Sequence, residues 1–354
     1  MPEAGSVNIF ERGLRSVDRA QQRYGPTAFV YAVIKKFGDD RGGSLAALLT
    51  FYGFLSLFPL LLLLVTILGF IGGNDHSFFH RVEASAFSQF PIVGSKLSSN
   101  IHQLHRKSVI ALVVGIAGVL WGSQGAIQSA QYAQAEVWNI PGEHRPNFWA
   151  RGGRTLIMMG TLFVFLVSST ALTGVVTFGH RSLPVIIGGI VGTVALNIAL
   201  FAVAFRILTP KHVDWTSLYY GSVAGGVGWT ALQYLGGILI NHTLRNTSQV
   251  YGFFAVILGL LGWIYLGAQI TLYAAEINVV KARHLWPRAI VQPPLTGADE
   301  RVLAAIVMQG KRRPEQSVSV GYRNANAAPF DPLAVEGTSV EGPQAVGEGG
   351  RGGH

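Results

Sequence analysis

The sequence contains no cysteine among its 354 residues, and only 13% of those residues are charged. The lack of cysteine excludes disulfides, iron–sulfur ligation and thiol nucleophiles. A soluble domain carries about 25% charged residues, so this shortage is typical of a chain whose surface lies largely in lipid. The formal net charge of +9 comes from basic residues scattered over the termini and loops. They form no stripe interleaved with aromatic residues, so we expect no nucleic-acid partner.

Long uncharged runs are what the sequence does contain. The first, Leu45 to Ile71, has no charged residue in 27 positions. As a helix it would extend about 40 Å, against about 30 Å for the hydrocarbon core of a bilayer. A charge near the bilayer centre costs about 2.5 to 3.5 kcal/mol, so a membrane explains the run better than a soluble core does. Five further uncharged runs of 23 to 26 residues follow: Ser108 to Ala130, Thr155 to Phe178, Leu183 to Phe205, Ser217 to Ile240 and Val250 to Ala275.

We therefore predict an all-α polytopic membrane protein with six transmembrane helices, divided into three parts. Residues 1–44 form a polar, basic N-terminal segment with an interfacial helix over Ala28 to Phe37. Residues 45–285 form the transmembrane domain, with a helix kink at Pro59 and amphipathic surface helices between Gly72 and Lys107. Residues 286–354 form a largely disordered tail, in which Ala298 to Arg313 can make one helix.

Lysine and arginine predict the orientation of the chain. The N-terminal segment, the second and fourth loops and the C-terminal segment hold 21 of these residues, whereas the first, third and fifth loops hold 6. Because basic residues are retained on the cytoplasmic side, both termini should be cytoplasmic. The first run is too long and too far from the N-terminus for a cleaved signal peptide, so we expect an uncleaved anchor.

Polar residues inside the predicted spans are the candidate functional residues. Gln124, Gln128 and Gln131 recur every three to four residues, so they share one helix face, and Glu136 follows near its cytoplasmic end. Hydrocarbon cannot satisfy amides, so these residues either hydrogen-bond to other helices or line a hydrated cavity or substrate path. Three amides of later spans could complete either arrangement: Asn197, Gln233 and Gln269.

Two further features have alternative interpretations. Glu276, where the sixth run ends, is either an interfacial carboxylate or, if buried beside Arg145 or Arg154, an intracellular gate or proton-coupling group. The Gly-x-x-x-Gly spacings, such as Gly221 with Gly225, indicate either close helix packing or a path for a substrate.

Motifs that carry chemistry are missing. There is no phosphate-binding loop, nucleophile elbow or His-Glu-x-x-His sequence. Two histidine pairs, His76 with His80 and His102 with His105, have a spacing that metal ligands can use, but no cysteine or catalytic glutamate motif accompanies them. We therefore expect no cofactor, no metal and no enzymatic activity.

Three stretches together resemble the YihY/BrkB family of bacterial inner-membrane proteins. The first, FGDDRGGSLAALLTFYGFLSLFPLLLLLVTILG, includes Ser56 and Pro59. The second, EVWNIPGEHRPNFWARGGR, includes Asn139 and Arg145, and the third, YGFFAVILGLLGWIYLGAQITLYAAEINVV, includes Glu276. The resemblance covers about residues 28 to 285 and implies a multi-pass protein of the inner membrane with both ends cytoplasmic. Some members carry an old label, ribonuclease BN, but the sequence offers no cluster that would hold a metal on the cytoplasmic side.

The leading interpretation is a transporter-like protein, or one that handles lipids or envelope precursors, with a polar path through the membrane. Its partners would be membrane lipids and a lipid-like substrate, and a homo-oligomer is compatible with it. The alternative is an accessory scaffold for envelope machinery that acts through its surface helices and tail, and deleting residues 289–354 would discriminate the two. A ribonuclease is the third interpretation. The candidate path or gate residues are Ser56, Pro59, Gln124, Gln128, Gln131, Asn139, Arg145, Asn197, Gln269 and Glu276.

Overall fold

The computed structural model describes residues 9–72, 109–145, 147–178, 183–209, 213–243 and 252–322. Within these ranges the chain is helical and contains no β-strand, which confirms the predicted all-α class. Six helices have 26 to 31 residues and would extend about 39 to 47 Å at 1.5 Å per residue. They are α3 (Gly42–Gly72), α6 (Val109–Val137), α7 (Phe148–Phe178), α8 (Leu183–Leu208), α9 (Trp215–Thr243) and α10 (Gly252–Ala282).

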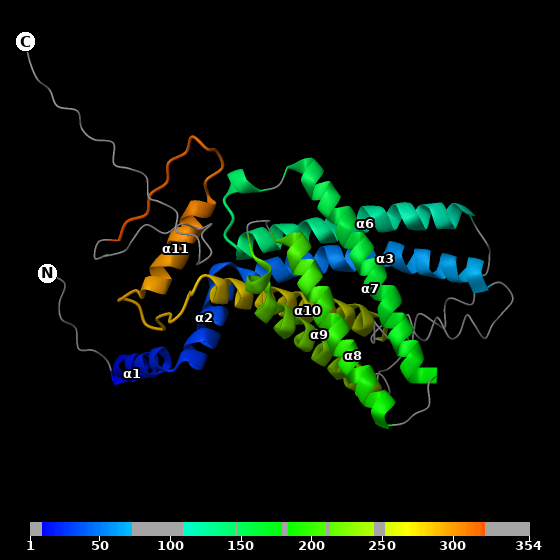
Figure 1. Ribbon diagram of the computed structural model, residues 1–354, viewed down its shortest axis with the longest axis horizontal. Helices are drawn as coiled ribbons and strands as arrows, with labels where there is room; N and C mark the ends of the chain where they lie inside the picture. Colours follow the sequence, from blue (N-terminus) through cyan, green and yellow to red (C-terminus); the bar gives the residue numbers. More distant parts are fainter. Residues whose placement is uncertain are drawn as a thin grey trace, which may run out of the picture.

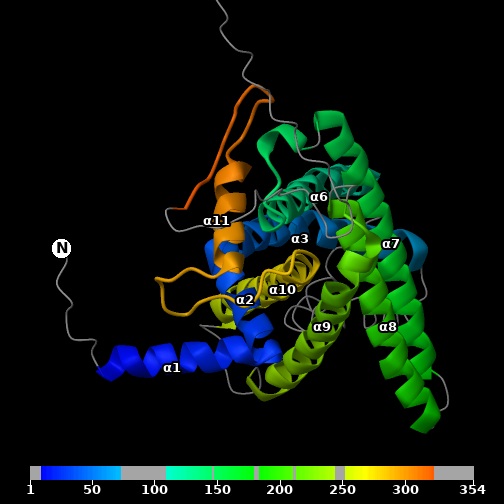
Figure 2. The ribbon, with the colours of Figure 1, turned by 60° about the vertical axis from the view of Figure 1, so that its left-hand side comes forward.

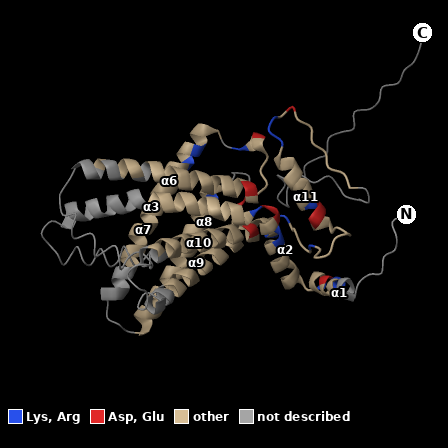
Figure 3. Ribbon diagram, turned by 180° about the vertical axis from the view of Figure 1, so that it is seen from behind, with Lys and Arg blue, Asp and Glu red and all other residues tan. Residues whose placement is uncertain are grey.

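The shorter helices gather at one end of this bundle, beside the starts of α3, α7 and α9 and the ends of α6, α8 and α10 (Figure 1). They are α1 (Ile9–Arg23), α2 (Gly25–Asp39), the 3-10 helix η1 (Gly142–His144) and α11 (Gly297–Gln309). Figure 3 shows that the charged residues of the described chain concentrate at this end, while the long helices beyond it are almost free of charge. We call it the charged end.

Several of the long helices have the surface of a protein that faces lipid. Three described segments are long and apolar enough to cross a membrane: Phe148–Leu172, Leu183–Leu208 and Ile257–Ala282, with Gly42–Leu57 as a shorter apolar helix. Large apolar side chains such as Phe163 and Val164 on α7 are more than half exposed. Exposed apolar side chains in this number would be unfavourable in water and are favourable against acyl chains.

The long helices pack through close backbone contacts. α3 lies along α6 and next to α10, and α9 lies between α8 and α10, while α7 and α8 run at a steep angle to α3 and α6 (Figures 1 and 2). A Cβ atom at Gly221 of α9 would lie 2.0 Å from the carbonyl oxygen of Ala274 on α10. A Cβ atom at Gly188, by contrast, would meet nothing within 4 Å. Close packing therefore accounts for Gly221, as one interpretation of the Gly-x-x-x-Gly spacings proposed.

The segments outside the bundle are more ordered than the sequence indicated. The predicted interfacial helix lies within α2, which buries Ala32, Val33 and Phe37 in the core of the charged end. Residues 286–322, placed in a largely disordered tail, form a packed loop and α11. The predicted helix over Ala298 to Arg313 corresponds to α11, which ends at Gln309, four residues before the predicted end. The predicted amphipathic helices between Gly72 and Lys107 and residues 323–354 lie outside the described residues.

Candidate functional site

The candidate site begins where α6 ends. Asn139 follows the last turn with φ of 47°, a left-handed conformation that asparagine tolerates better than most residues. The amide of Ile140 donates to the carbonyl oxygen of Ala135 at 2.9 Å, which closes the helix end in the manner of a Schellman motif. This turn places the carbonyl oxygen of Val137 and the side chain of Asn139 toward α2.

A buried triad of charged side chains, Lys36, Asp40 and Glu276, joins α2 to α10. Their side chains are 0%, 1% and 0% exposed. The Lys36 ammonium donates to Asp40, lies 3.5 Å from Glu276 and donates to the carbonyl oxygen of Val137 at 2.9 Å. The triad thus connects α2, α6 and α10 at one point, where water is excluded.

The charges of the buried triad do not balance. One ammonium faces two carboxylates, so the triad carries one negative charge in excess when all three groups are ionised. Neither carboxylate oxygen of Glu276 has a hydrogen-bond partner among the described residues. A buried, uncompensated carboxylate is unfavourable by several kcal/mol, so the fully ionised triad carries an electrostatic cost that a balanced pair would not.

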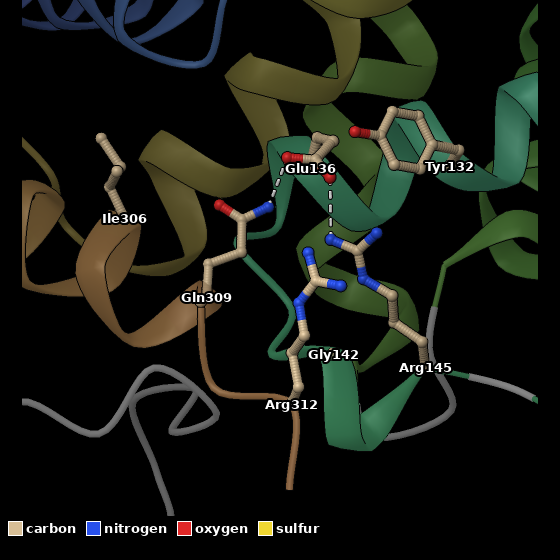
Figure 4. A pocket seen from close by; sticks show the side chains of 8 residues that line it. Tyr132, Glu136, Gly142, Arg145, Ile306, Gln309 and Arg312 are labelled. Atoms are coloured by element: carbon tan, nitrogen blue, oxygen red, sulfur yellow. Dashed lines mark hydrogen bonds and ion pairs between the residues drawn. The ribbon is translucent and has the colours of Figure 1, made fainter. Parts of the chain in front are cut away.

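A chain of hydrogen bonds runs from the buried triad toward the surface. The Asn139 amide donates to Asp40 at 3.2 Å and lies 3.4 Å from the side-chain oxygen of Gln309 on α11. Gln309 in turn donates to Glu136 at 2.5 Å, and Glu136 accepts from Arg145 at 2.8 Å (Figure 4). The end of α6, the loop after it and α11 therefore form one polar network.

This network ends in a surface cavity of about 520 Å³ between α6, η1 and α11. We call it the arginine pocket, after Arg145 and Arg312. Its lining residues are Tyr132, Glu136, Gly142, Arg145, Ile306, Gln309, Gly310 and Arg312. Arg145 also lies over the ring of Tyr132, with its guanidinium carbon 5.4 Å from the ring centre, which holds its side chain against α6.

The position of α11 depends on a second polar cluster, centred on Asp299. Asp299 accepts from Arg288 at 2.5 Å, from Lys35 at 2.9 Å and from the backbone amide of Ala289 at 3.0 Å. Burial alone would raise the pKa of the Asp299 carboxyl, but these hydrogen bonds hold that pKa well below its usual value. Asp299 is also the third residue of the capping box that starts α11 at Thr296, so one carboxylate both starts the helix and docks it.

The structure brings three of the predicted site residues together, Asn139, Arg145 and Glu276, at the charged end. The ion partner of Glu276 differs from the expectation. Arg145 pairs with Glu136 instead, and Lys36 lies beside Glu276. The reason is that Lys36 shares the buried face of α2 with Ala32, four residues earlier.

The other candidates lie away from this site. Gln131 is buried and donates to Thr155 of α7 at 3.2 Å, whereas Gln128 is half-buried and Gln124 is exposed. Asn197 donates to Thr230 of α9 at 2.8 Å, which is an interhelical hydrogen bond. The Ser56 hydroxyl donates to the carbonyl oxygen of Gly53 on its own helix, and Gln269 is half-buried on α10. At Pro59, α3 continues as one helix, and the side chain of Pro59 lies outside the described residues.

Several residues of the site were not among the candidates. Lys36 and Asp40 fell in the predicted interfacial helix and the break after it, and Gln309 and Arg312 fell in the predicted tail. One signal was present for Lys36, because Ala28, Ala32 and Lys36 recur every four residues and so occupy one helix face. No comparable signal identifies Gln309 or Arg312.

The long apolar helices, their exposed apolar faces and the concentration of charge at one end define a helical integral membrane protein. Within that class, the family model described as Virulence factor BrkB matches residues 33–292. The chain belongs to the BrkB family. Residues of the buried triad and the whole end of α6 lie inside the matched range, whereas α11 follows it.

Two curated relatives span most of the chain. Inner membrane protein YhjD of Escherichia coli (strain K12) is 22% identical over 278 residues, covering 72% of this chain and 81% of the relative. YfkH of Bacillus subtilis (strain 168), named for a likeness to ribonucleases, is 23% identical over 271 residues, covering 72% of this chain and 94% of the relative. No solved structure matches the chain.

Proposed function

We propose that the chain is a transporter-like protein of the cytoplasmic membrane that moves a lipid-like or envelope-precursor substrate, with the buried triad in its cytoplasmic gate. The observation that carries the proposal is the triad itself, with two carboxylates and one ammonium in the place where α2, α6 and α10 meet. A charge surplus of this kind serves no structural purpose that a balanced pair would not serve better. No covalent step belongs to the proposal.

The proposed topology has six spans, α3, α6, α7, α8, α9 and α10, with both termini in the cytoplasm. Each of these helices exceeds the roughly 20 residues needed to cross the hydrocarbon core. The charged end then faces the cytoplasm, because the segments gathered there hold most of the lysine and arginine. The relative named an inner membrane protein supports the same membrane.

The proposed path follows one ridge of α6, formed by Gln124, Gln128, Tyr132 and Glu136. These residues are four apart, and each remains exposed or half-buried. The ridge covers about 18 Å, from the middle of α6 to the arginine pocket, of which Tyr132 and Glu136 are lining residues. Amides at membrane depth are unfavourable against acyl chains, whereas they could bind the polar head of an amphipathic substrate whose tails stay in lipid.

The gate would open through a change of charge in the buried triad. Protonation of one carboxylate leaves a balanced pair with Lys36, and loss of that proton restores the surplus negative charge. Because Asp40 also accepts from Asn139, the charge state is communicated to Gln309 and Glu136 at the arginine pocket. The proposed coupling is therefore between the charge of the Glu276 carboxyl and the contacts that close the cytoplasmic end.

The path can be tested with single cysteines, since the natural chain contains none. Gln128→Cys in membrane vesicles should react with a membrane-impermeant maleimide from one side. Val164→Cys is the matched control, because Val164 is 64% exposed on α7 but has no place on the ridge. If Gln128→Cys is as unreactive as Val164→Cys in vesicles of either orientation, the proposed path is wrong.

The gate can be tested by lipid movement in proteoliposomes that contain a fluorescent short-chain phospholipid, read by dithionite quenching. We expect movement above that of protein-free liposomes, with a pH dependence that Glu276→Gln removes. Gln128→Leu should slow the movement at every pH without removing the pH dependence. A pH dependence unchanged in Glu276→Gln would eliminate the coupling role of that carboxyl.

A further inference from the structure

The arginine pocket holds an unneutralised positive charge. Glu136 accepts from Arg145 through one carboxylate oxygen at 2.8 Å and from Gln309 through the other at 2.5 Å. One carboxylate thus faces two guanidinium groups, those of Arg145 and Arg312, in a cavity of about 520 Å³. The pocket carries a net charge of +1 from its lining residues.

Arg312 is the residue that supplies this surplus. Its backbone amide donates to Gln316 at 2.7 Å, which fixes the main chain after α11. Among the described residues, no acceptor lies within hydrogen-bonding distance of its guanidinium, which Figure 4 shows directed into the pocket beside Arg145. Two guanidinium groups repel each other, and an oxyanion between them removes the repulsion and accepts their fork-shaped donors.

The walls of the pocket suit an amphipathic anion better than a fully polar one. Ile306 and the ring of Tyr132 give it apolar surface, and the α6 ridge continues from Tyr132 toward the middle of the long helices. The volume lies within the range of about 300 to 1,000 Å³ usual for small-molecule sites. In the proposed topology the pocket lies at the cytoplasmic end of α6, where lipid headgroups would be within reach.

We propose that the arginine pocket binds a phosphate group of a lipid headgroup, held by Arg145 and Arg312. This inference rests on the proposed function for the orientation of the charged end, and it names the substrate class of the path along α6. Arg145 keeps its bonds to Glu136 and to the carbonyl oxygen of Ile140, while its remaining donors face the phosphate. Arg312 contributes the charge that no protein carboxylate neutralises.

The test measures binding to the purified full-length chain in a non-ionic detergent by isothermal titration calorimetry. The probes are dioctanoyl phosphatidic acid, dioctanoyl phosphatidylcholine and inorganic phosphate. We expect phosphatidic acid to bind at least tenfold more tightly than phosphatidylcholine, whose phosphate is accompanied by a cation. The affinity should fall as sodium chloride is raised, because the pocket is open to solvent and its charge is screened.

Arg312→Gln should weaken phosphatidic acid binding about tenfold, the effect of losing one charge-assisted hydrogen bond. Arg312→Lys should recover part of the loss, since it restores the charge without the fork of donors. Arg313→Gln is the matched control, because Arg313 is exposed as Arg312 is but does not line the pocket. Equal affinities for Arg312→Gln and Arg313→Gln, or no binding of phosphatidic acid to the natural chain, would overturn the proposal.

The source of the phosphate is decided by the third probe. If inorganic phosphate binds as tightly as phosphatidic acid and Arg312→Gln weakens both equally, the site takes a soluble phosphate and the lipid assignment is wrong. The failure of this inference is distinguishable from the failure of the proposed function. Maleimide labelling of Gln128→Cys tests the path without any phosphate, and the calorimetry tests the pocket without any transport.

Discussion

Removing the cation of the buried triad should destabilise the protein far more than removing one of its carboxylates. Lys36 lies 3.5 Å from Glu276 and also donates to Asp40. At an effective dielectric constant of about 20, a pair at that separation attracts with about 5 kcal/mol. Lys36→Met leaves two buried carboxylates without a counterion, and removal of one partner from a buried ion pair costs about 3 to 5 kcal/mol.

Glu276→Gln has a different result, because it leaves Lys36 and Asp40 as a balanced pair of nearly unchanged volume. We expect a change in the free energy of unfolding within about 1 kcal/mol. The double variant Lys36→Met/Glu276→Gln should be more stable than Lys36→Met alone, since one of the two uncompensated charges is gone. This non-additivity is the signature of a direct interaction.

The assay is thermal unfolding of each full-length variant in detergent, followed by tryptophan fluorescence. Trp138 is buried next to the carbonyl that Lys36 contacts, so it reports on this region. At about 2 to 4 °C per kcal/mol, Lys36→Met should lower the midpoint by about 6 °C or more and Glu276→Gln by less than about 4 °C. Arg313→Gln, an exposed change of charge, is the control. Equal losses for the two single variants would refute the charge imbalance on which the gate depends.

Other predictions concern the docking of α11 and the packing of α9. Asp299→Asn should release α11, seen as faster hydrogen exchange over residues 297–309, because the ion pairs of Asp299 with Lys35 and Arg288 are lost. Folding lowers the pKa of the Asp299 carboxyl, so its carboxylate fully stabilises the docked α11 at any pH above the usual carboxyl pKa near 3.9. This stabilisation is lost only as the pH falls through the lower pKa that Asp299 has in the folded protein. Protection of α11 should therefore be constant from pH 5 to 8, and a loss near pH 6 would contradict the assignment. Gly221→Ala should lower the unfolding midpoint by several degrees, because its Cβ would lie 2.0 Å from a backbone oxygen of α10. Gly188→Ala should leave the midpoint unchanged, because its Cβ would meet nothing within 4 Å. Similar midpoints for the two variants would show that α9 and α10 are not in that contact.

The positions of the long helices could be predicted from the sequence because one physical property determines them. An uncharged run of more than 20 residues has few stable states other than a helix in an apolar environment. The predicted run Leu183 to Phe205 lies within α8, and Val250 to Ala275 overlaps most of α10. The helices extend further than the runs, since charged residues such as Arg206 and Lys281 continue the helix beyond its apolar part.

The site was only partly predictable, because its decisive contacts join residues that are far apart in the chain. Glu276 and Lys36 are separated by 240 positions, and nothing in either local sequence indicates the other. The interpretation of Glu276 as a buried gate named Arg145 or Arg154 as its partner, yet Arg145 is paired with Glu136 nine residues away. Asn139 was identified through the family resemblance, whereas its role in linking Asp40 to α11 follows only from the fold.

The contribution of α11 to the site changes the experiment that separates a transporter from a scaffold. Deleting residues 289–354 removes Gln309 and Arg312 as well as Asp299, one of the two carboxylates paired with Arg288, so either kind of protein would fail. A chain ending after Tyr322 keeps these contacts, including the bond from the Tyr322 hydroxyl to the carbonyl oxygen of Glu300 at 2.9 Å. We expect that chain to retain both its unfolding midpoint and its lipid movement in proteoliposomes. Loss of lipid movement on this shorter truncation, with the midpoint unchanged, would place the activity in residues 323–354 and contradict a path along α6.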